Sequence, residues 1–495
     1  MDPEDNQSYN ENLNEDQGNV DYNQQDMDNN LNNQNEDNQN QSDNNQEINK
    51  RDAIVTNLNE EELTLEDKIL DKLNGGFAAL ELEREKKDLI VRTAKEIDSS
   101  LSDDIINRIY DDINNLGMIE ELVTNEDIED IAINNTSSIF AYFGGGKTVN
   151  TDFKFNKRID LVRFVKKLML YSTNSEDNNN IVDVHMKNGS RANIINSPRG
   201  YDVTIRNFKK NALSVLDLIN FGEFDYNVAA RLWLYMDGFN VRPANILIAG
   251  MPSAGKTSLL NSLFSFIRPD ERVITMEETY ELDTSMSENV VNLETNNYLP
   301  MVELVKNSLR MRPDMLIIGE VRGPEANDMI TAMNVGNICL GTIHATSSRD
   351  IINRLENSPM NVLMGVIPAI DALIVLSKVY IDGKPIRKII QMSEISGIET
   401  QILLSDLYKF DYKTHRAAAI LPSVTYRDRL SQAIGVPPPD ILAEESVRVQ
   451  ILMRLNQLGI RDIKRISQVV QEYYSNPDQL LVKLGLNNLH PIIRI

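Results

Sequence analysis

Residues 245–258 have the sequence Asn-Ile-Leu-Ile-Ala-Gly-Met-Pro-Ser-Ala-Gly-Lys-Thr-Ser. Its apolar start, Ile246 to Ala249, is typical of a buried parallel strand, and a helical pattern follows from Leu259 to Phe266. Between them lies Gly-x-x-x-x-Gly-Lys-Thr, from Gly250 to Thr257. A glycine-bounded loop between a strand and a helix is the context in which this pattern binds phosphate groups.

The residue types of this loop have physical reasons. Gly255 allows the backbone to approach a phosphate closely, so that successive N–H groups point at it, and the helix that follows adds the positive end of its dipole. Lys256 can reach the β- and γ-phosphates, and the Thr257 hydroxyl can bind Mg²⁺. We therefore expect a nucleoside triphosphate to be bound by Gly250, Ser253, Gly255, Lys256, Thr257 and Ser258.

Charge is distributed unevenly along the 495 residues, whose net charge is −24. Residues 1–50 contain 13 Asp and Glu and one Lys, together with 16 Asn and 8 Gln, so half of the net charge lies in this first tenth. Such a stretch cannot bury enough apolar surface to offset the entropy of ordering, and we expect residues 1–60 to be a disordered acidic tail. A solvated tail without chemistry is the simpler interpretation, and a regulatory or tethering role is the alternative.

Composition and the length of apolar runs exclude several classes of protein. The single cysteine, Cys339, excludes an intrachain disulfide and a cysteine-based zinc site. No apolar run approaches the roughly 18–20 residues that span a bilayer, and the N-terminus lacks the pattern of a signal peptide. The acidic balance without a dense Lys/Arg run argues against general nucleic-acid binding. We therefore expect a cytoplasmic protein.

Hydrophobic periodicity divides the rest of the chain into four parts. The parts are a helical segment at 61–115, an α+β domain at 116–222, an α/β domain at 223–400 and a C-terminal strand and helical extension at 401–495. In the third part apolar strands alternate with helical stretches, which predicts a mainly parallel sheet covered by helices. These strands are expected at Asn245–Ala249, Val273–Met276, Met315–Ile318, Ile338–Ile343, Ala372–Val379 and Lys388–Met392.

Three further expectations concern single positions. Gly146-Lys147-Thr148 resembles the end of the phosphate loop, but Ala141 stands where the pattern needs Gly and no helix follows, so we predict a hairpin turn. Trp233, the only tryptophan, lies on a predicted helix and is interpreted as a core residue. Pro437-Pro438-Pro439 is expected to break the chain before the helices of a small appendage over 423–486.

Three of the predicted strands end in residues that can act on a nucleotide, and ligands bind at the carboxyl ends of such strands. Strand 315–318 precedes Glu320, which can orient a water, accept its proton or hold the water shell of Mg²⁺. Strand 273–276 precedes Glu277-Glu278-Thr279-Tyr280-Glu281, whose acids suit metal-water contacts. Strand 338–343 precedes His344, which can contact or sense a γ-phosphate. An ordinary polar residue at a strand end is the alternative in each case.

Four motifs occur in one order along the chain. After the phosphate loop come Met276-Glu-Glu-Thr-Tyr-Glu-Leu282, Leu309-Arg-Met-Arg-Pro-Asp-Met-Leu-Ile-Ile-Gly-Glu-Val-Arg322, and Gly341-Thr-Ile-His-Ala-Thr346. This combination resembles the type II/IV secretion-system ATPase family over roughly residues 117–400. Arg354-Leu-Glu-Asn-Ser-Pro-Met-Asn-Val362 is most similar to its archaeal branch, which powers type IV pilus-like filaments and the archaellum. The chain is also similar to the tight-adherence pilus ATPases.

The resemblance implies a RecA-like P-loop domain after the smaller α+β domain. It implies ATP hydrolysis with Mg²⁺ by a cytoplasmic homohexamer that associates with the inner face of the cell membrane. It further implies that the motor drives pilin-like filament subunits through a polytopic membrane platform protein. A conjugation-type DNA-transfer ATPase or a filament-retraction ATPase is the alternative, and a non-catalytic nucleotide-binding scaffold is a third possibility.

The resemblance also implies roles for residues outside the loop. Lys187-Asn-Gly-Ser-Arg191 and Thr204-Ile-Arg-Asn-Phe208 resemble two arginine-bearing segments of the family's N-terminal domain, so Arg191 and Arg206 are expected to stabilise transition-state charge. From the residues alone, both would be surface arginines. The implied catalytic set is Glu320, Lys256, Arg191, Arg206, Glu278 and His344, with Thr257 and, through water, Glu320 on Mg²⁺. Several positions depart from the family pattern. Pro252 and Ala254 lie in the loop, where the family usually has Thr-Gly-Ser or similar, Glu278 replaces the usual Asp, and Asn337 stands where a His often precedes the histidine box.

Overall fold

The computed structural model describes residues 51–491 except 55, 79, 81, 144–146, 173–179, 208–211, 297 and 382. Residues 1–50, which make up most of the predicted acidic tail, and the glycine of the predicted hairpin turn, Gly146, lie outside the described residues. The described residues from Asp52 onward belong to one compact unit.

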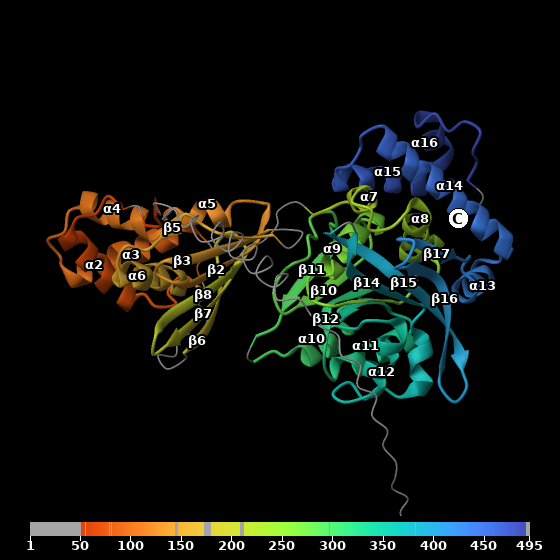
Figure 1. Cartoon of the computed structure of the whole chain (residues 1–495), viewed down its shortest axis with the longest axis horizontal. Helices are drawn as coiled ribbons and strands as arrows, with labels where there is room; N and C mark the ends of the chain where they lie inside the picture. Colours follow the sequence, from red (N-terminus) through yellow and green to blue (C-terminus); the bar gives the residue numbers. More distant parts are fainter. Residues whose placement is uncertain are drawn as a thin grey trace, which may run out of the picture. The chain divides into compact units, whose positions relative to one another are not determined.

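A nine-stranded sheet carries the second half of the chain (Figure 1). Its strand order is β11 (Val290–Glu294), β10 (Val273–Glu277), β12 (Met315–Val321), β13 (Ile338–Ile343), β9 (Ile246–Gly250), β14 (Ala372–Ile381), β15 (Lys384–Ile398), β16 (Ile402–Asp411) and β17 (Arg416–Ile420). Neighbours from β11 to β14 are parallel, and those from β14 to β17 are antiparallel. The predicted α/β class with a mainly parallel sheet is therefore confirmed, and the sheet continues into an antiparallel wing.

Both faces of this sheet are covered by helices, as Figure 1 shows. Ile246 and Ile248 of β9 belong to one hydrophobic core, and Leu247 and Ala249 belong to the other, because successive side chains of a strand point to opposite faces. The first core includes residues of α7 (Val215–Asn220), α8 (Tyr226–Asp237), α9 (Lys256–Leu263), α13 (Thr425–Ile434), α14 (Pro438–Gln457), α15 (Ile463–Ser475) and α16 (Pro477–Lys483). The second includes residues of α10 (Met301–Ser308), α11 (Glu325–Asn334) and α12 (Ser348–Glu356). This double burial explains the continuous apolar runs of the strands.

The C-terminal helices differ from the expectation of a small appendage, because their apolar residues share a core with the sheet. The predicted break lies at 435–437, between α13 and α14, and Pro438 and Pro439 then form the first turn of α14, where a missing N–H costs no hydrogen bond. Trp233 of α8 is fully buried, as predicted, and the Arg448 guanidinium of α14 lies 4.9 Å from the centre of its ring. Arg448 also pairs with Asp237 at 2.9 Å, which fastens α14 to α8.

A six-stranded antiparallel sheet carries the first half. Its order is β4 (Thr148–Asn150), β3 (Ser138–Phe143), β2 (Ile128–Asn135), β8 (Gly200–Arg206), β7 (Arg191–Ser197) and β6 (Ile181–His185). Helices α5 (Ile119–Val123) and α6 (Arg158–Met169) pack on it, which completes the predicted α+β domain. β3 and β4 pair antiparallel on either side of the predicted turn, so this stretch forms a hairpin as expected.

A helical layer precedes this smaller sheet. It consists of α2 (Glu60–Lys72), α3 (Glu83–Ile97) and α4 (Asp103–Ile113), which share a separate hydrophobic cluster. Lys167 of α6 is buried between them, with its ammonium 3.3 Å from Glu66 of α2 and 2.6 Å from Asp112 of α4. These ion pairs attach the layer to the smaller sheet. The short strands β1 (Arg51–Asp52) and β5 (Phe153–Lys154) and the 3₁₀ turns η1 (Gly238–Asn240), η2 (Phe264–Phe266) and η3 (Met364–Ala369) complete the list.

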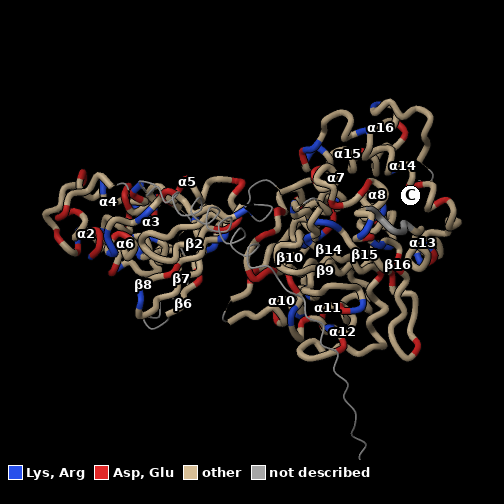
Figure 2. The backbone as a smooth tube through the Cα atoms, viewed as in Figure 1, with Lys and Arg blue, Asp and Glu red and all other residues tan. Residues whose placement is uncertain are grey.

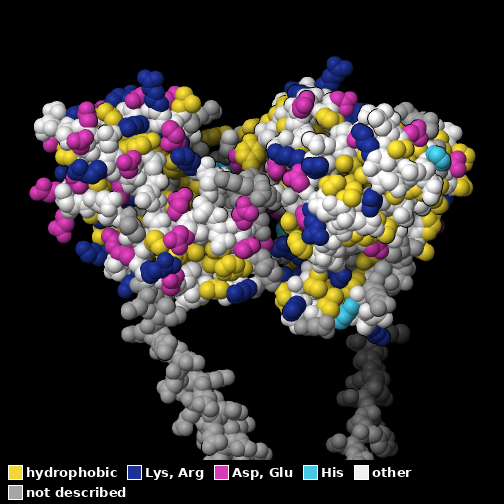
Figure 3. All heavy atoms as spheres, turned by 90° about the horizontal axis from the view of Figure 1, so that it is seen from above, with side chains coloured by type: hydrophobic (Ala, Val, Ile, Leu, Met, Phe, Trp, Pro, Cys, Tyr) yellow, Lys and Arg dark blue, Asp and Glu magenta, His cyan; other side chains and the backbone are white. Residues whose placement is uncertain are grey.

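Charged residues of both signs are interspersed along the described backbone (Figure 2). On the face seen in Figure 3, acidic, basic and apolar side chains alternate in small mixed patches. Across the residues that the structure describes, no helix combines the length and the apolar character needed to cross a membrane.

Candidate active site

The phosphate loop connects the carboxyl end of β9 to the first turn of α9. Gly255 has φ of 99°, a left-handed conformation that favours glycine, and a Cβ at this position would lie 3.2 Å from Cδ of Arg387. No side chain of the described residues caps α9, and no acid lies in its first turn. Its first N–H groups are therefore oriented for an external acceptor, as a phosphate requires.

Lys256 is directed toward the loop that it follows. Its Nζ donates to the carbonyl oxygens of Gly250, at 2.9 Å, and Met251, at 3.4 Å. Burial lowers the pKa of Lys256, while the nearby carboxylates of Glu320 and Glu281 oppose that shift. The ammonium thus stands among acids in a partly desolvated place, where a phosphate charge would interact with it strongly.

Glu320 is aimed by a bulge near the end of β12. The pairing of β12 with β13 shifts between Ile318 and Val321, so that Gly319 and Glu320 face Thr342 alone. The Thr342 hydroxyl donates to the carbonyl of Gly319 at 2.6 Å and holds this bulge. Gly319 is needed here because an added Cβ would lie 3.0 Å from Cγ of Glu277.

Arg322, His344 and Lys256 surround the Glu320 carboxylate. Arg322 donates to both of its oxygens, at 2.7 and 2.8 Å, and Nε2 of His344 lies 2.8 Å from Oε1. Burial by itself raises the pKa of Glu320, but the hydrogen bonds and charge of Arg322, with His344 and Lys256, lower it overall. Glu320 is therefore ionised at neutral pH. Arg322 directly follows the carboxyl end of β12, and that position is the signal by which sequence reasoning could have assigned it a role.

Glu277 differs from Glu320 in its surroundings. It is the last residue of β10 and only 3% exposed. Its Oε1 accepts the backbone N–H of Glu281 at 3.0 Å, whereas its Oε2 has no partner among the described residues. Burial raises the pKa of Glu277 to about 7, although hydrogen bonding to the backbone N–H groups of Glu281 and Leu282 opposes the shift. This carboxyl can therefore exchange a proton near neutral pH.

The next two acids of this segment have other partners. Glu278, named in the sequence-based set, is about half exposed and accepts from Arg322 at 3.0 Å. Glu281 accepts from the Thr257 hydroxyl at 3.1 Å, and its backbone carbonyl accepts from Asn261 at 3.0 Å. Since Thr257 is the expected Mg²⁺ ligand, Glu281 lies where a carboxylate can contact the water shell of that ion.

Both predicted arginines come from the smaller sheet and reach the segment after β10. Arg191 at the start of β7 donates to the Thr279 hydroxyl and pairs with Asp183 at 3.0 Å. Arg206 at the end of β8 pairs with Asp130 at 3.2 Å and with Glu281 at 3.4 Å. Arg191 and Arg206 face each other across the β7–β8 pairing, which explains how two positions distant in sequence serve one place.

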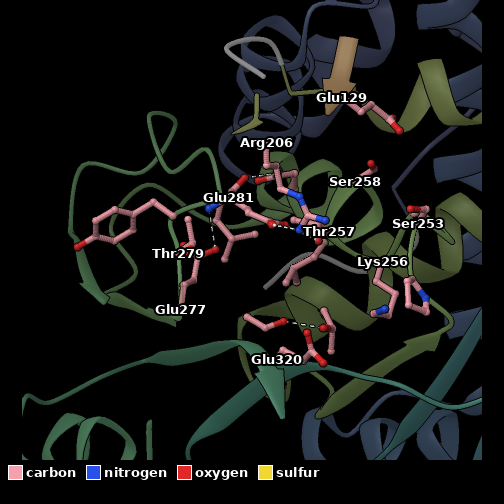
Figure 4. A pocket seen from close by; sticks show the side chains of 18 of the residues that line it. Glu129, Arg206, Ser253, Lys256, Thr257, Ser258, Glu277, Thr279, Glu281 and Glu320 are labelled. Atoms are coloured by element: carbon pink, nitrogen blue, oxygen red, sulfur yellow. Dashed lines mark hydrogen bonds and ion pairs between the residues drawn. The ribbon is translucent and has the colours of Figure 1, made fainter. Parts of the chain in front are cut away.

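These residues line one cleft of about 510 Å³, a size that suits a small ligand. Figure 4 shows Glu277, Thr279 and Glu281 on one side, Ser253 and Lys256 on the other, and Glu320 below. The cleft brings together the predicted residues Ser253, Gly255, Lys256, Thr257, Ser258, Glu278, Glu320, His344, Arg191 and Arg206. It also includes four charged residues that sequence reasoning did not assign: Glu129, Asp130, Arg322 and Arg387.

Two other positions noted in the sequence, Gly250 and Asn337, do not line the cleft. Gly250 is not among the lining residues; a Cβ there would approach the Leu376 carbonyl oxygen to 2.8 Å, so the glycine serves close packing below the loop. Asn337 precedes the amino end of β13, whereas His344 follows the carboxyl end, and its amide donates to the Ala332 carbonyl at 3.4 Å. Asn337 therefore lies at the far end of the strand from the cleft.

The donor set is compatible with Mg²⁺. The described residues contain no cluster of three or more metal-ligating side chains. Mg²⁺ keeps several of its waters and takes one or two protein oxygens beside the phosphates. The Thr257 hydroxyl, with Glu281 and Glu320 placed to contact those waters, fits this preference better than it fits a dehydrated metal.

Comparison with known proteins indicates the same family as the order of the motifs. The sequence model of the family described as "Type II/IV secretion system protein" matches residues 112–380, more than half of the chain. An uncharacterized protein of Methanocaldococcus jannaschii, MJ0900, is 28% identical over 382 residues, covering 73% of this chain and 68% of its own length. The conjugal transfer protein TrbB of Rhizobium radiobacter is 37% identical over 116 residues, covering 23% of this chain and 36% of its own length.

The crystal structure of the pilus retraction motor PilT with bound ADP aligns at 14% identity and a TM-score of 0.44, over 74% of this chain and 95% of that chain. The extent of the family match and the order of the four motifs lead to one conclusion. The chain belongs to the type II/IV secretion system protein family.

Proposed function

We propose that the protein hydrolyses ATP and thereby powers the assembly or secretion of type IV pilus-like filament subunits. The observation that carries the proposal is one cleft that contains a phosphate loop, carboxylates at strand ends and two arginines from the smaller sheet. Phosphoryl transfer depends on charge neutralisation and on a positioned water, and these groups can supply both. Membership of the secretion family supports the cellular role.

The chemistry divides among the side chains of the cleft. Lys256 neutralises phosphate charge, and Thr257 binds Mg²⁺, which when bound supplies further neutralisation. Glu320, kept ionised by Arg322 and oriented by His344, orders water near the phosphates. Glu277 takes the proton of the attacking water, because it lines the cleft and its pKa is about 7.

Arg191 and Arg206 connect this chemistry to movement. They project from the smaller sheet, so they can stabilise charge on the phosphates only while that sheet is closed against the loop. Nucleotide binding energy would then become domain closure, and release would follow hydrolysis. We propose that a homohexamer uses this cycle at the inner face of the cell membrane. A polytopic platform protein would pass the movement to pilin-like subunits.

Purified protein tests the enzymatic part directly. Lys256→Ala and Glu320→Gln should each abolish phosphate release from ATP while leaving the circular dichroism spectrum unchanged. Lys306→Ala and Glu303→Gln are matched controls, because these exposed residues of α10 pair with each other at 3.3 Å and do not line the cleft. Normal turnover by Glu320→Gln would contradict its assigned role. Absence of turnover in the unaltered protein would contradict the ATPase proposal.

Conjugal DNA transfer is the second candidate function. It is favoured by the sequence similarity between this chain and conjugal transfer proteins, which include TrbB of Rhizobium radiobacter. Filament retraction is a further alternative within the pilus-related class. Neighbouring genes discriminate: a polytopic platform gene with pilin-like genes supports filament work, and relaxase or coupling-protein genes support DNA transfer.

A further inference from the structure

Arg387 makes two contacts that join different parts of the cleft. It lies on β15, beyond the residues that the family model matches, and none of the four motifs contains it. Its Nε donates to the carbonyl oxygen of Ser253 in the phosphate loop at 3.1 Å. One of its terminal nitrogens donates to Oε1 of Glu129, on β2 of the smaller sheet, also at 3.1 Å. The guanidinium thus bridges the loop and the smaller sheet.

Two loop residues beside Arg387, Ser253 and Gly255, have positive φ angles. Ser253 has φ of 60°, which is uncommon for a residue other than glycine, and Arg387 binds its carbonyl. Gly255 packs against the Arg387 stem so closely that a Cβ would lie 3.2 Å from Cδ. Arg387 therefore supports the loop on both sides of Ala254, where the backbone N–H groups must stay aligned for a phosphate.

At the other end of the bridge, Glu129 is held in place by the smaller sheet. The pairing of β2 with β3 shifts between Ile128 and Asp130, and this irregularity explains why the consecutive acids Glu129 and Asp130 both line the cleft. The carbonyl of Glu129 accepts the backbone N–H of Asn207 at 2.9 Å. The buried Asn207 amide in turn donates to the Leu122 carbonyl at 2.9 Å. Glu129 is therefore held by the frame of the smaller sheet.

We propose that Arg387 is a positioning residue that couples the smaller sheet to the phosphate loop through its simultaneous bonds to Glu129 and to the Ser253 carbonyl. The inference rests on the proposed function and names a regulatory contact of the same site. When the smaller sheet is in place, Glu129 orients the guanidinium, and the guanidinium sets the loop for phosphate. When the sheet moves away, the loop loses that support and nucleotide binds more weakly. The planar fork of arginine suits this task, since its donors point in fixed directions.

A double-mutant cycle on the full-length protein tests the coupling, with ADP and Mg²⁺ as the probe and isothermal titration as the measurement. Arg387→Gln should raise the Kd for ADP about tenfold. Glu129→Gln should raise it about fivefold in the unaltered chain but should cause no further rise when residue 387 is already Gln, because coupled residues are not additive. Equal effects of Glu129→Gln in both backgrounds would overturn the proposal.

Asp130→Asn is the matched control for charge. It removes the same negative charge from the next residue of the same strand, but the Asp130 side chain pairs with Arg206 rather than Arg387. Its effect on the Kd should therefore be the same, within about twofold, with Arg or Gln at residue 387. If Asp130→Asn showed the same dependence on residue 387 as Glu129→Gln, the cycle would be reporting general electrostatics and the proposal would fail.

Steady-state kinetics and a conservative variant complete the test. Arg387→Gln should raise KM for ATP about tenfold and change kcat less than about twofold, because the groups that act on water are untouched. A collapse of kcat with unchanged KM would overturn the positioning role. Arg387→Lys keeps the charge but not the fork, and it should restore little of the affinity; full restoration would overturn the two-point contact.

The two proposals fail in distinguishable ways. If the unaltered chain binds no ADP, both are overturned. If it binds ADP and hydrolyses ATP but the cycle is additive, only the role of Arg387 is overturned. Should Arg387→Gln not fold, the Arg387→Lys variant and its own cycle with Glu129→Gln decide the question with the same expected sign.

Discussion

Oε1 of Glu320 lies 2.8 Å from Nε2 of His344, across the carboxyl ends of the neighbouring strands β12 and β13. Burial lowers the pKa of His344, and the nearby charge of Lys256 lowers it further. The imidazole is therefore neutral at pH 7, and its Nε2–H can donate to the Glu320 carboxylate.

The first prediction concerns this contact. His344→Ala should lower kcat at least about tenfold, because Glu320 loses a donor that orients it, while the Kd for ADP should stay within about twofold. Phosphate release and ADP titration measure the two quantities. His490→Ala, at an exposed residue near the C-terminus, should change neither. An equal loss of ADP binding in His344→Ala would mean that His344 supports the nucleotide rather than Glu320.

The pH dependence of turnover should report Glu277. Its pKa is raised to about 7, so the carboxyl is protonated below that pH and cannot accept a proton from water. We expect kcat to rise as pH increases through about 7, whereas Glu320, with its lowered pKa, remains ionised over the same range. Rates measured between about pH 5.5 and 9 locate the midpoint. A profile that is flat between pH 6 and 8 would exclude Glu277 as the proton acceptor.

The arginines of the smaller sheet should act on chemistry more than on binding. Arg206→Gln should lower kcat about 1,000-fold with a small effect on ADP affinity, because an arginine that stabilises transition-state charge contributes little to the ground state. Arg191→Gln should act in the same direction. Arg199→Gln is the matched control, since Arg199 is exposed in the turn between β7 and β8. Tenfold weaker ADP binding with unchanged kcat would assign these arginines to binding instead.

Removal of Mg²⁺ should abolish turnover, and the hydroxyl of residue 257 should determine the concentration required. Thr257→Ala removes the hydroxyl that now donates to Glu281 at 3.1 Å, so half-maximal activity should need about tenfold more Mg²⁺ or higher. Thr257→Ser keeps the hydroxyl and should behave like the unaltered protein. Titration of activity with MgCl₂ after EDTA treatment measures both. Equal Mg²⁺ requirements for the Ala and Ser variants would contradict the assignment of Thr257.

Stability should depend on the buried pair of Arg448 and Asp237. Both side chains are almost completely buried, with exposed fractions of 2% and 1%. Arg448→Ala should destabilise the fold by about 3–5 kcal/mol, because it leaves a buried carboxylate without its partner. Arg84→Ala is the control: Arg84 is 91% exposed, and its pair with Asp88 should contribute well under about 1 kcal/mol. Thermal unfolding followed by circular dichroism compares the two variants, and equal melting temperatures would contradict the prediction.

The strands and the phosphate loop were predictable because their signals are local. A parallel strand covered on both faces is apolar along its whole length, so β9, β10, β12 and β13 appear in the sequence as short apolar runs. β11 was not predicted, and β16 was predicted only as a strand without bounds in the extension at 401–495, since edge and wing strands mix polar and apolar residues. The break predicted at the prolines lies just before α14, but the sequence did not show that Pro438 and Pro439 belong to its first turn, because proline interrupts a helix from within and yet is favourable at its start.

How the two adjacent acids at the end of β10 differ in their surroundings was not decided by sequence. Glu277 and Glu278 are adjacent and chemically identical, yet the first is buried with an unpartnered oxygen and the second is half exposed beside Arg322. The choice depends on where β10 ends and on the bulge of β12, which brings Gly319 against Glu277. Both depend on pairing between strands and not on either segment alone.

Local sequence was enough to identify the nucleotide loop, the order of its accompanying motifs and the class of the sheet, because each depends on residues close together in the chain. The set of side chains that complete the cleft depends on tertiary packing. Arg387 and Glu129 are separated by 258 positions, and Arg191 and Thr279 by 88. Such contacts arise from strand register and from the packing of one sheet beside another, and side-chain periodicity within a single segment carries no record of them.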